Sequence, residues 1–85
     1  MSYWNYRIIL KEDKRLKAKL YQIHEVYYSK KGKIKGWTEN PVAPYGETKK
    51  ELKKELKYFQ NALKHPILKE KKKGKKTILV EKKKI

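Results

Sequence analysis

The chain has 85 residues, no cysteine, and 25 Lys plus Arg against 9 Asp plus Glu, which gives a formal net charge of +16. A chain of this length supports one hydrophobic core, has no disulfide scaffold, and contains no apolar run long enough to cross a bilayer. Its first residues also lack the basic-then-apolar order of a signal peptide, so we expect a cytoplasmic protein.

The first half of the chain predicts three antiparallel strands. Residues 3–10 are rich in aromatic and branched side chains, and the charged residues 11–19 predict a connecting loop. A second strand is expected over residues 20–28 and, after a turn at Gly32, a third over residues 33–40. The alternate positions that form one face of the first strand are Trp4, Tyr6, Ile8 and Leu10.

A helix is predicted after a rigid loop. Residues 41–46 contain two prolines, which keep this segment extended. Thr48 precedes Glu51 by three positions, which is the pattern of a capping box, and Pro66 prevents the helix from continuing. The apolar residues expected on the helix face toward the sheet are Leu52, Leu56, Phe59 and Leu63.

The pattern as a whole predicts an α+β fold, in which a three-stranded antiparallel meander is followed by one amphipathic helix packed on one face. Residues 1–68 would form this βββα domain, and residues 69–85 a lysine-rich tail. The tail contains one short apolar segment, residues 77–80, which favours a fourth strand that pairs with a sheet edge in this chain or in a partner. Without such pairing the tail would be disordered.

No arrangement of side chains indicates catalysis. His24 and Glu25 are neighbours on a predicted strand, so they point to opposite faces and do not serve one site. Two histidines without cysteine do not make a zinc site, and no acidic cluster suits Mg²⁺. We therefore expect a protein without enzymatic activity, cofactor, metal or small-molecule substrate.

The excess of lysine predicts a polyanionic partner. Of the 25 basic residues, 23 are Lys, which acts as a flexible point charge, whereas Arg forms a rigid fork matched to phosphate or guanine. Attraction to a nucleic-acid backbone is therefore favoured over base reading. The alternative is a merely solubilising surface, because AT-rich genomes and thermophilic proteins also enrich Lys. They normally enrich Glu with it, and the low Glu content here favours the polyanionic partner.

Two Trp, seven Tyr and one Phe exceed what one helix covers, which predicts exposed or interfacial aromatic rings. If the first strand turns its aromatic face to the helix, Arg7 lies on the open face of the sheet with Lys35 and Trp37. His24 and Tyr28 would share that face. It would suit stacking on unpaired bases, a protein partner or a homodimer, and Trp37 could equally pack on a neighbouring strand.

The turn Gly46-Glu47-Thr48, which leads into the amphipathic helix, resembles the Gly-Asp-Thr turn of the HicB-like antitoxin domain, a truncated ribonuclease-H-like fold. Residues 4–9, 23–28 and 41–47 also look like segments of small uncharacterised prokaryotic proteins. The resemblance covers residues 4–68. It implies a non-enzymatic protein that dimerises, masks a small basic ribonuclease toxin and often binds its own operator.

The function predicted first is that of a small basic non-enzymatic protein, an accessory nucleic-acid-binding component (RNA or DNA) of a larger complex. The alternative is a protein-binding regulatory module of antitoxin or inhibitor type that uses the sheet edge or the tyrosine-rich face. The side chains expected to contact nucleic acid are Arg7, Lys35, Trp37, Lys53, Lys57, Lys69, Lys71, Lys72, Lys73, Lys75 and Lys76.

Overall fold

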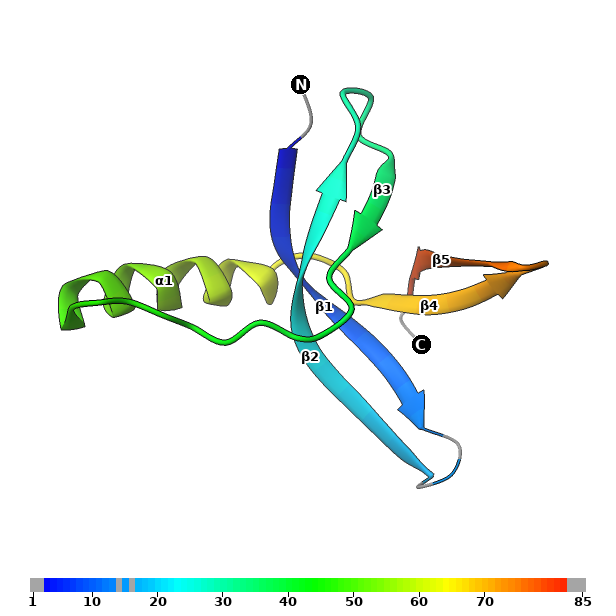
Figure 1. Cartoon of the computed structure of the whole chain (residues 1–85), viewed down its shortest axis with the longest axis horizontal. Coiled ribbons are helices and arrows are strands. Elements are labelled where there is room, and N and C mark those ends of the chain that lie inside the picture. Colours follow the sequence, from blue (N-terminus) through cyan, green and yellow to red (C-terminus); the bar gives the residue numbers. More distant parts are fainter. Residues whose placement is uncertain (1–2, 14, 16, 83–85) are drawn as a thin grey trace.

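The computed structural model describes residues 3–13, 15 and 17–82 of the chain (Figure 1). In chain order the elements are β1 (Tyr3–Asp13), β2 (Ala18–Tyr28), β3 (Ile34–Trp37), α1 (Lys49–Ala62), β4 (Leu68–Lys73) and β5 (Lys76–Glu81). The predicted α+β class is therefore confirmed. Within the described residues, no helix has the length and apolar character needed to cross a membrane.

The five strands form one mixed sheet in the order β3-β2-β1-β4-β5. β1 and β2 pair antiparallel along their whole lengths and make a long ribbon that includes part of the predicted loop over residues 11–19. β4 runs parallel to β1, and its register with β1 covers only the pairs Ile9↔Leu68 and Leu10↔Lys69. The short contact between β1 and β4 therefore joins the C-terminal strands to the rest of the sheet.

β3 is shorter than the strand predicted over residues 33–40, because regular pairing ends at Trp37. The chain still follows β2 for a few residues, since Thr38 N donates to Glu25 O at 3.0 Å and Val42 N donates to Ile23 O at 2.9 Å. Pro41 and Pro44 lie on either side of Val42 and have no backbone N–H to donate, so this segment cannot form a continuous ladder with β2.

The start of α1 follows the capping box predicted from the sequence. Thr48 Oγ1 accepts a hydrogen bond from Glu51 N at 3.1 Å, and the Glu51 carboxylate accepts one from Glu47 N at 2.8 Å. Gly46 packs closely beneath this turn, because a Cβ at its position would lie 2.5 Å from Leu52 N. The cap therefore needs a side-chain oxygen that can accept at position 48, and it leaves no room for a Cβ at position 46.

The apolar stripe of α1 faces the sheet only in part. Phe59 and Ala62 are buried, and the Phe59 ring packs against Tyr6 of β1 with 4.5 Å between the ring centroids. Leu63 is instead 69% exposed, and the two other leucines of the stripe are exposed as well. The prediction that all four side chains face the sheet is wrong, because α1 crosses a narrow part of the sheet and its first half runs beyond it (Figure 1).

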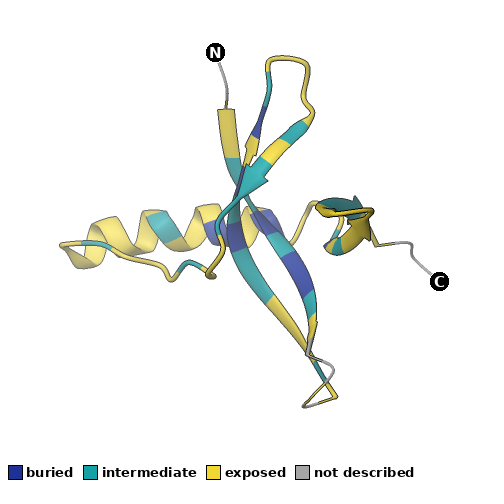
Figure 2. Ribbon diagram, turned by 45° about the vertical axis from the view of Figure 1, so that its right-hand side comes forward, coloured by how far each residue is buried: buried dark blue, intermediate teal, exposed yellow. Residues whose placement is uncertain are grey.

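The main core lies on the other face of β1 and β2. Trp37 Nε1 on β3 donates to Glu70 Oε2 on β4 at 3.3 Å, across the two strands between them, so the sheet curls over this face. Figure 2 shows the buried residues gathered where β1 and β2 cross α1. The buried members of the core cluster are Ile9, Val26, Tyr28 and Leu68, and the partly buried residues packed against them are Ile34, Trp37 and Leu79.

The lysine-rich tail forms an antiparallel hairpin of β4 and β5, paired from Leu68↔Glu81 to Lys73↔Lys76. The strand predicted at residues 77–80 is present as β5 and pairs within this chain. Its partner β4 was not predicted, so the sheet is more than a three-stranded meander. The burial of Leu68 in the core and the long-range pairing outweigh the weak strand preference of lysine.

Candidate nucleic-acid interface

Most of the predicted contact residues lie on the β4–β5 hairpin, which projects from the sheet (Figure 1). Side chains alternate between the faces of the ribbon, so the odd-numbered lysines of β4 share one face, and Lys76 lies beside them on β5. Lys72 lies on the opposite face. The hairpin lysines, all of them exposed, are Lys69, Lys71, Lys72, Lys73, Lys75 and Lys76.

The hairpin forms because β5 supplies the apolar residues that β4 lacks. Leu79 packs against the core, while Ile78 and Val80 lie partly buried on the other face of the ribbon, directly opposite Lys71 and Lys69 of β4. The turn contains two residues, of which Gly74 has a φ of 64°, as the first position of a type II′ turn requires. A lysine-rich segment is thus held in one defined shape.

The tip of the hairpin carries an excess of positive charge. Residues 71–76 contain five lysines and no acidic residue. Lys69 Nζ lies 3.2 Å from Glu12 Oε1, but within the described part of the chain none of the five lysines beyond it has an acidic partner. The tip therefore presents five uncompensated positive charges to solvent.

A groove of about 430 Å³ lies between β1 and the hairpin, and we call it the hairpin groove. Both of its carboxylates are occupied, since Glu12 pairs with Lys69 and Glu70 accepts from the Trp37 indole. The remaining charged groups on its wall are lysines, so the groove suits an anion. Its lining residues are Leu10, Lys11, Glu12, Trp37, Lys69, Glu70, Lys71, Lys72 and Thr77.

Arg7 does not belong to the interface. It is only 8% exposed, with Nη1 donating to the Tyr28 hydroxyl at 3.0 Å and Nη2 donating to Pro66 O at 2.8 Å. His24 is buried on the same face. The prediction of an open sheet face around Arg7 is therefore wrong, because the curl of the sheet turns that face into the main core.

The other predicted contacts are divided between the groove and distant surfaces. Trp37 borders the hairpin groove, but it packs against the core and its indole N–H is bonded to Glu70, which agrees with the packing alternative. Lys35 is exposed on β3, at the other edge of the sheet. Lys53 and Lys57 are exposed on α1, on the far side of the β1–β2 ribbon from the hairpin (Figure 1).

His24 has a structural environment. Its Nδ1 lies 2.9 Å from Thr38 O and therefore donates, while Nε2 is buried without a partner in the described part of the chain. Burial lowers the pKa of His24, and Lys11 lowers it further against the opposing effect of the Thr38 bond. Among the described residues, no three His, Cys, Asp or Glu side chains are grouped to hold a metal ion.

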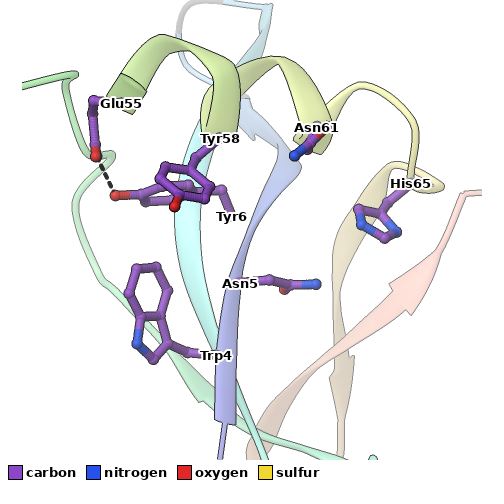
Figure 3. A pocket seen from close by; sticks show the side chains of 7 residues that line it. All are labelled: Trp4, Asn5, Tyr6, Glu55, Tyr58, Asn61 and His65. Carbon is purple, nitrogen blue, oxygen red and sulfur yellow. Dashed lines mark hydrogen bonds between the residues drawn. The ribbon is translucent and has the colours of Figure 1, made fainter. Parts of the chain in front are cut away.

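A second hollow, of about 560 Å³, lies between β1 and α1, and we call it the aromatic pocket (Figure 3). The Tyr6 hydroxyl donates to Glu55 Oε1 at its side, and burial together with this bond raises the pKa of Tyr6. Sequence reasoning did not select this site, although Trp4 and Tyr6 were expected to face the helix. Its lining residues are Trp4, Asn5, Tyr6, Glu55, Tyr58, Asn61 and His65.

Compared with protein-family models, curated proteins and solved structures, the chain shows no match to any of the three. The interpretation of its surfaces therefore rests on their own geometry and charge.

Proposed function

We propose that this protein is a small non-enzymatic nucleic-acid-binding component of a larger complex, and that the β4–β5 hairpin binds the phosphate backbone. The observation that carries the proposal is the group of five lysines at residues 71–76, which are exposed, lack acidic partners among the described residues and stand on a folded ribbon. Lysine ammonium groups neutralise phosphates and release their counterions, which is the main source of sequence-independent affinity.

The shape of the hairpin supports this role. A two-stranded β-ribbon fits the major groove of duplex DNA, and lysines on both faces would reach phosphates on either side. Because Leu68 and Leu79 anchor the ribbon in the core, binding does not carry the entropy cost of ordering a disordered tail. Contacts of this kind position a protein on nucleic acid without reading its sequence.

Two triple variants of equal charge test the proposal. The first replaces Lys72, Lys73 and Lys75 with Gln at the hairpin tip, and the control is the triple variant K30Q, K31Q and K33Q in the β2–β3 turn, where the lysines are also exposed. Each phosphate contact contributes about 0.9 to the slope of log K against log salt, so we expect the hairpin variant to lose about 2.7 of that slope. The control should keep the wild-type slope.

The measurement is fluorescence anisotropy with labelled single-stranded RNA and duplex DNA over a salt series, with heparin as a generic polyanion. Equal losses in the two variants would assign binding to overall charge and contradict a hairpin site. Equal affinity for heparin and both nucleic acids would reduce the role to general polyanion adhesion, and absence of binding at low salt would remove it.

The exposed leucines of α1 favour a second candidate, a protein-binding regulatory module of antitoxin or inhibitor type. Leu52, Leu56 and Leu63 form a stripe on one side of the helix, which is the pattern of anchors that a partner's groove accepts. The resemblance to the HicB-like antitoxin domain points the same way. A Leu63→Gln variant would then lose partner binding that changes little with salt, and would keep its affinity for nucleic acid.

A further inference from the structure

The aromatic pocket carries a more specific inference, which rests on the proposed nucleic-acid binding. We infer that this pocket binds one unpaired base of a single-stranded nucleic acid, while the hairpin lysines hold phosphates farther along the same strand. Its volume of about 560 Å³ falls within the range of small-molecule sites, about 300–1,000 Å³. Pockets of that kind combine apolar walls with a few convergent polar groups.

The walls are aromatic and held in place. Trp4 meets Tyr6 edge-on, with 5.2 Å between ring centroids and 75° between the ring planes, and Tyr6 in turn packs on the buried Phe59. Trp4 is nevertheless 50% exposed and Tyr58 59% exposed, so both retain ring surface for a ligand. Figure 3 shows Trp4 extending from β1 and Tyr58 descending from α1, both on the side of β1 on which Tyr6 lies.

The polar groups of the pocket match the edge of a base. Asn5 borders the pocket, but its side chain lies on the core face of β1, where Oδ1 accepts from the Tyr28 hydroxyl at 2.8 Å, so the groups that can meet a base come from α1. Asn61 carries both donors and acceptors, and the Glu55 carboxylate accepts from Tyr6 through one oxygen only. Asparagine pairs with adenine and carboxylates accept from the cytosine amino group, so the pocket offers partners for a base.

The charge of the pocket lining and of the whole chain favours a base over a phosphate or a cationic ligand. Among the residues that the structure describes, no Lys or Arg lines the pocket, so it does not suit a phosphate. Aromatic walls beside Glu55 would also accept an ammonium or guanidinium group from a protein partner. The net charge of +16 repels such a cation, whereas it attracts a nucleic acid whose bases are neutral.

The pocket is also connected to the hairpin lysines. His65 borders the pocket and Lys71, the first of the five tip lysines, is six residues later on β4, so their Cα atoms are at most about 22 Å apart. A single strand several nucleotides long can therefore place a base in the pocket and reach the hairpin with phosphates farther along the strand.

The test compares single-stranded and duplex probes of the same sequence by fluorescence anisotropy, with the full chain. Tyr58→Ala removes one wall from an exposed helical position, where alanine favours the helix. The matched control is Tyr45→Ala, whose side chain is 72% exposed on the loop before α1 and outside the pocket. We expect Tyr58→Ala to weaken single-strand binding about 5- to 150-fold, as for loss of one base–aromatic stack, and to leave duplex binding unchanged.

Equal single-strand affinity of wild type and Tyr58→Ala would overturn the pocket and leave the hairpin function standing. Loss of binding to both probes in the hairpin triple variant, with Tyr58→Ala unaffected, would also overturn the pocket alone. A parallel loss in Tyr45→Ala would likewise contradict a site at the pocket. Circular dichroism of each variant separates loss of binding from loss of folding.

Free nucleosides supply a second readout that does not depend on the lysines, because they carry no phosphate. The indole N–H resonance of Trp4 is identified by its disappearance in Trp4→Phe, and titration with adenosine or cytidine should shift it while leaving that of Trp37 in place. A shift caused by choline but not by nucleosides would assign the pocket to cations and overturn the inference.

Discussion

The two faces of β1 differ in how well they are covered. The odd-numbered face, with Arg7 and Ile9, is enclosed by the curled sheet and forms the main core. The even-numbered face, with Trp4 and Tyr6, is covered by one helix that contacts it from Glu55 onward, and it retains the aromatic pocket. One face of the strand therefore carries the main core, whereas the other is only partly covered, with Leu10 buried and Trp4 half exposed.

The largest effect on stability is expected from shortening a buried side chain on the enclosed face of β1. Ile9 has no exposed surface, so Ile9→Ala should lower the free energy of unfolding by about 2–5 kcal/mol through lost burial and the cavity left behind. A domain of this size has only a few kcal/mol in total, so the variant should be largely unfolded at room temperature. Urea denaturation measures this, and a midpoint close to that of wild type would contradict the assignment of the core.

A smaller effect should follow from removing one hydroxyl on the same face. Tyr28→Phe keeps the ring that stacks on Tyr3 but leaves Arg7 Nη1 and Asn5 Oδ1 without their common partner. We expect a loss of about 1–3 kcal/mol in the free energy of unfolding, because two polar groups lose a hydrogen bond away from bulk water. If Arg7, Tyr28 and Asn5 act as one network, the double variant of Tyr28→Phe with Asn5→Ala should lose less free energy of unfolding than the sum of the losses in the two single variants.

The buried His24 should make this face sensitive to pH. Its pKa is lowered from 6.5 in the folded state, so as pH falls the unfolded chain takes up the proton first. Stability is therefore greatest above pH 6.5 and declines as the pH drops from there toward the lower folded-state pKa. His24→Asn keeps a donor toward Thr38 O and does not titrate, so its free energy of unfolding should change less over that window. If the free energy of unfolding of wild type and of His24→Asn changed equally with pH, His24 would not be the source of the pH dependence.

The smallest effect is expected on the open face. Leu63 is 69% exposed, so Leu63→Ala should change the free energy of unfolding by no more than about 0.5 kcal/mol. The contrast with Ile9→Ala uses the same denaturation measurement. A loss above about 1 kcal/mol would mean that the leucine stripe is covered in solution, by another copy or by another part of the chain.

Local patterns predicted some elements well. The helix starts at the expected capping box because Thr48, Glu51 and the turn before them interact within a few residues. The strands β1 and β2 follow from alternating side chains, and β5 from four adjacent β-favouring residues. In each case the information lies within a short stretch of sequence.

The remaining features depend on contacts between distant segments. β4 consists mainly of lysine and becomes a strand through pairing with β1 and β5. Its sequence has no alternation of apolar residues from which a strand could be predicted. Arg7 is buried because its guanidinium reaches Tyr28 and Pro66, which are 21 and 59 positions away in the chain. The aromatic pocket likewise combines β1 with α1 and His65, so no single motif predicts it.

The register between β1 and β4 covers two residue pairs, and this short junction has a dynamic consequence. We expect amide hydrogen exchange to reveal two units that open independently, the β1–β2 ribbon and the β4–β5 hairpin. Amides in the middle of β1 and β2 should exchange only through global unfolding, whereas those of β4 and β5 should exchange through local detachment of the hairpin. If the hairpin binds a polyanion as proposed, the bound polyanion should slow amide exchange selectively in β4 and β5, because detachment of the hairpin would then require its release.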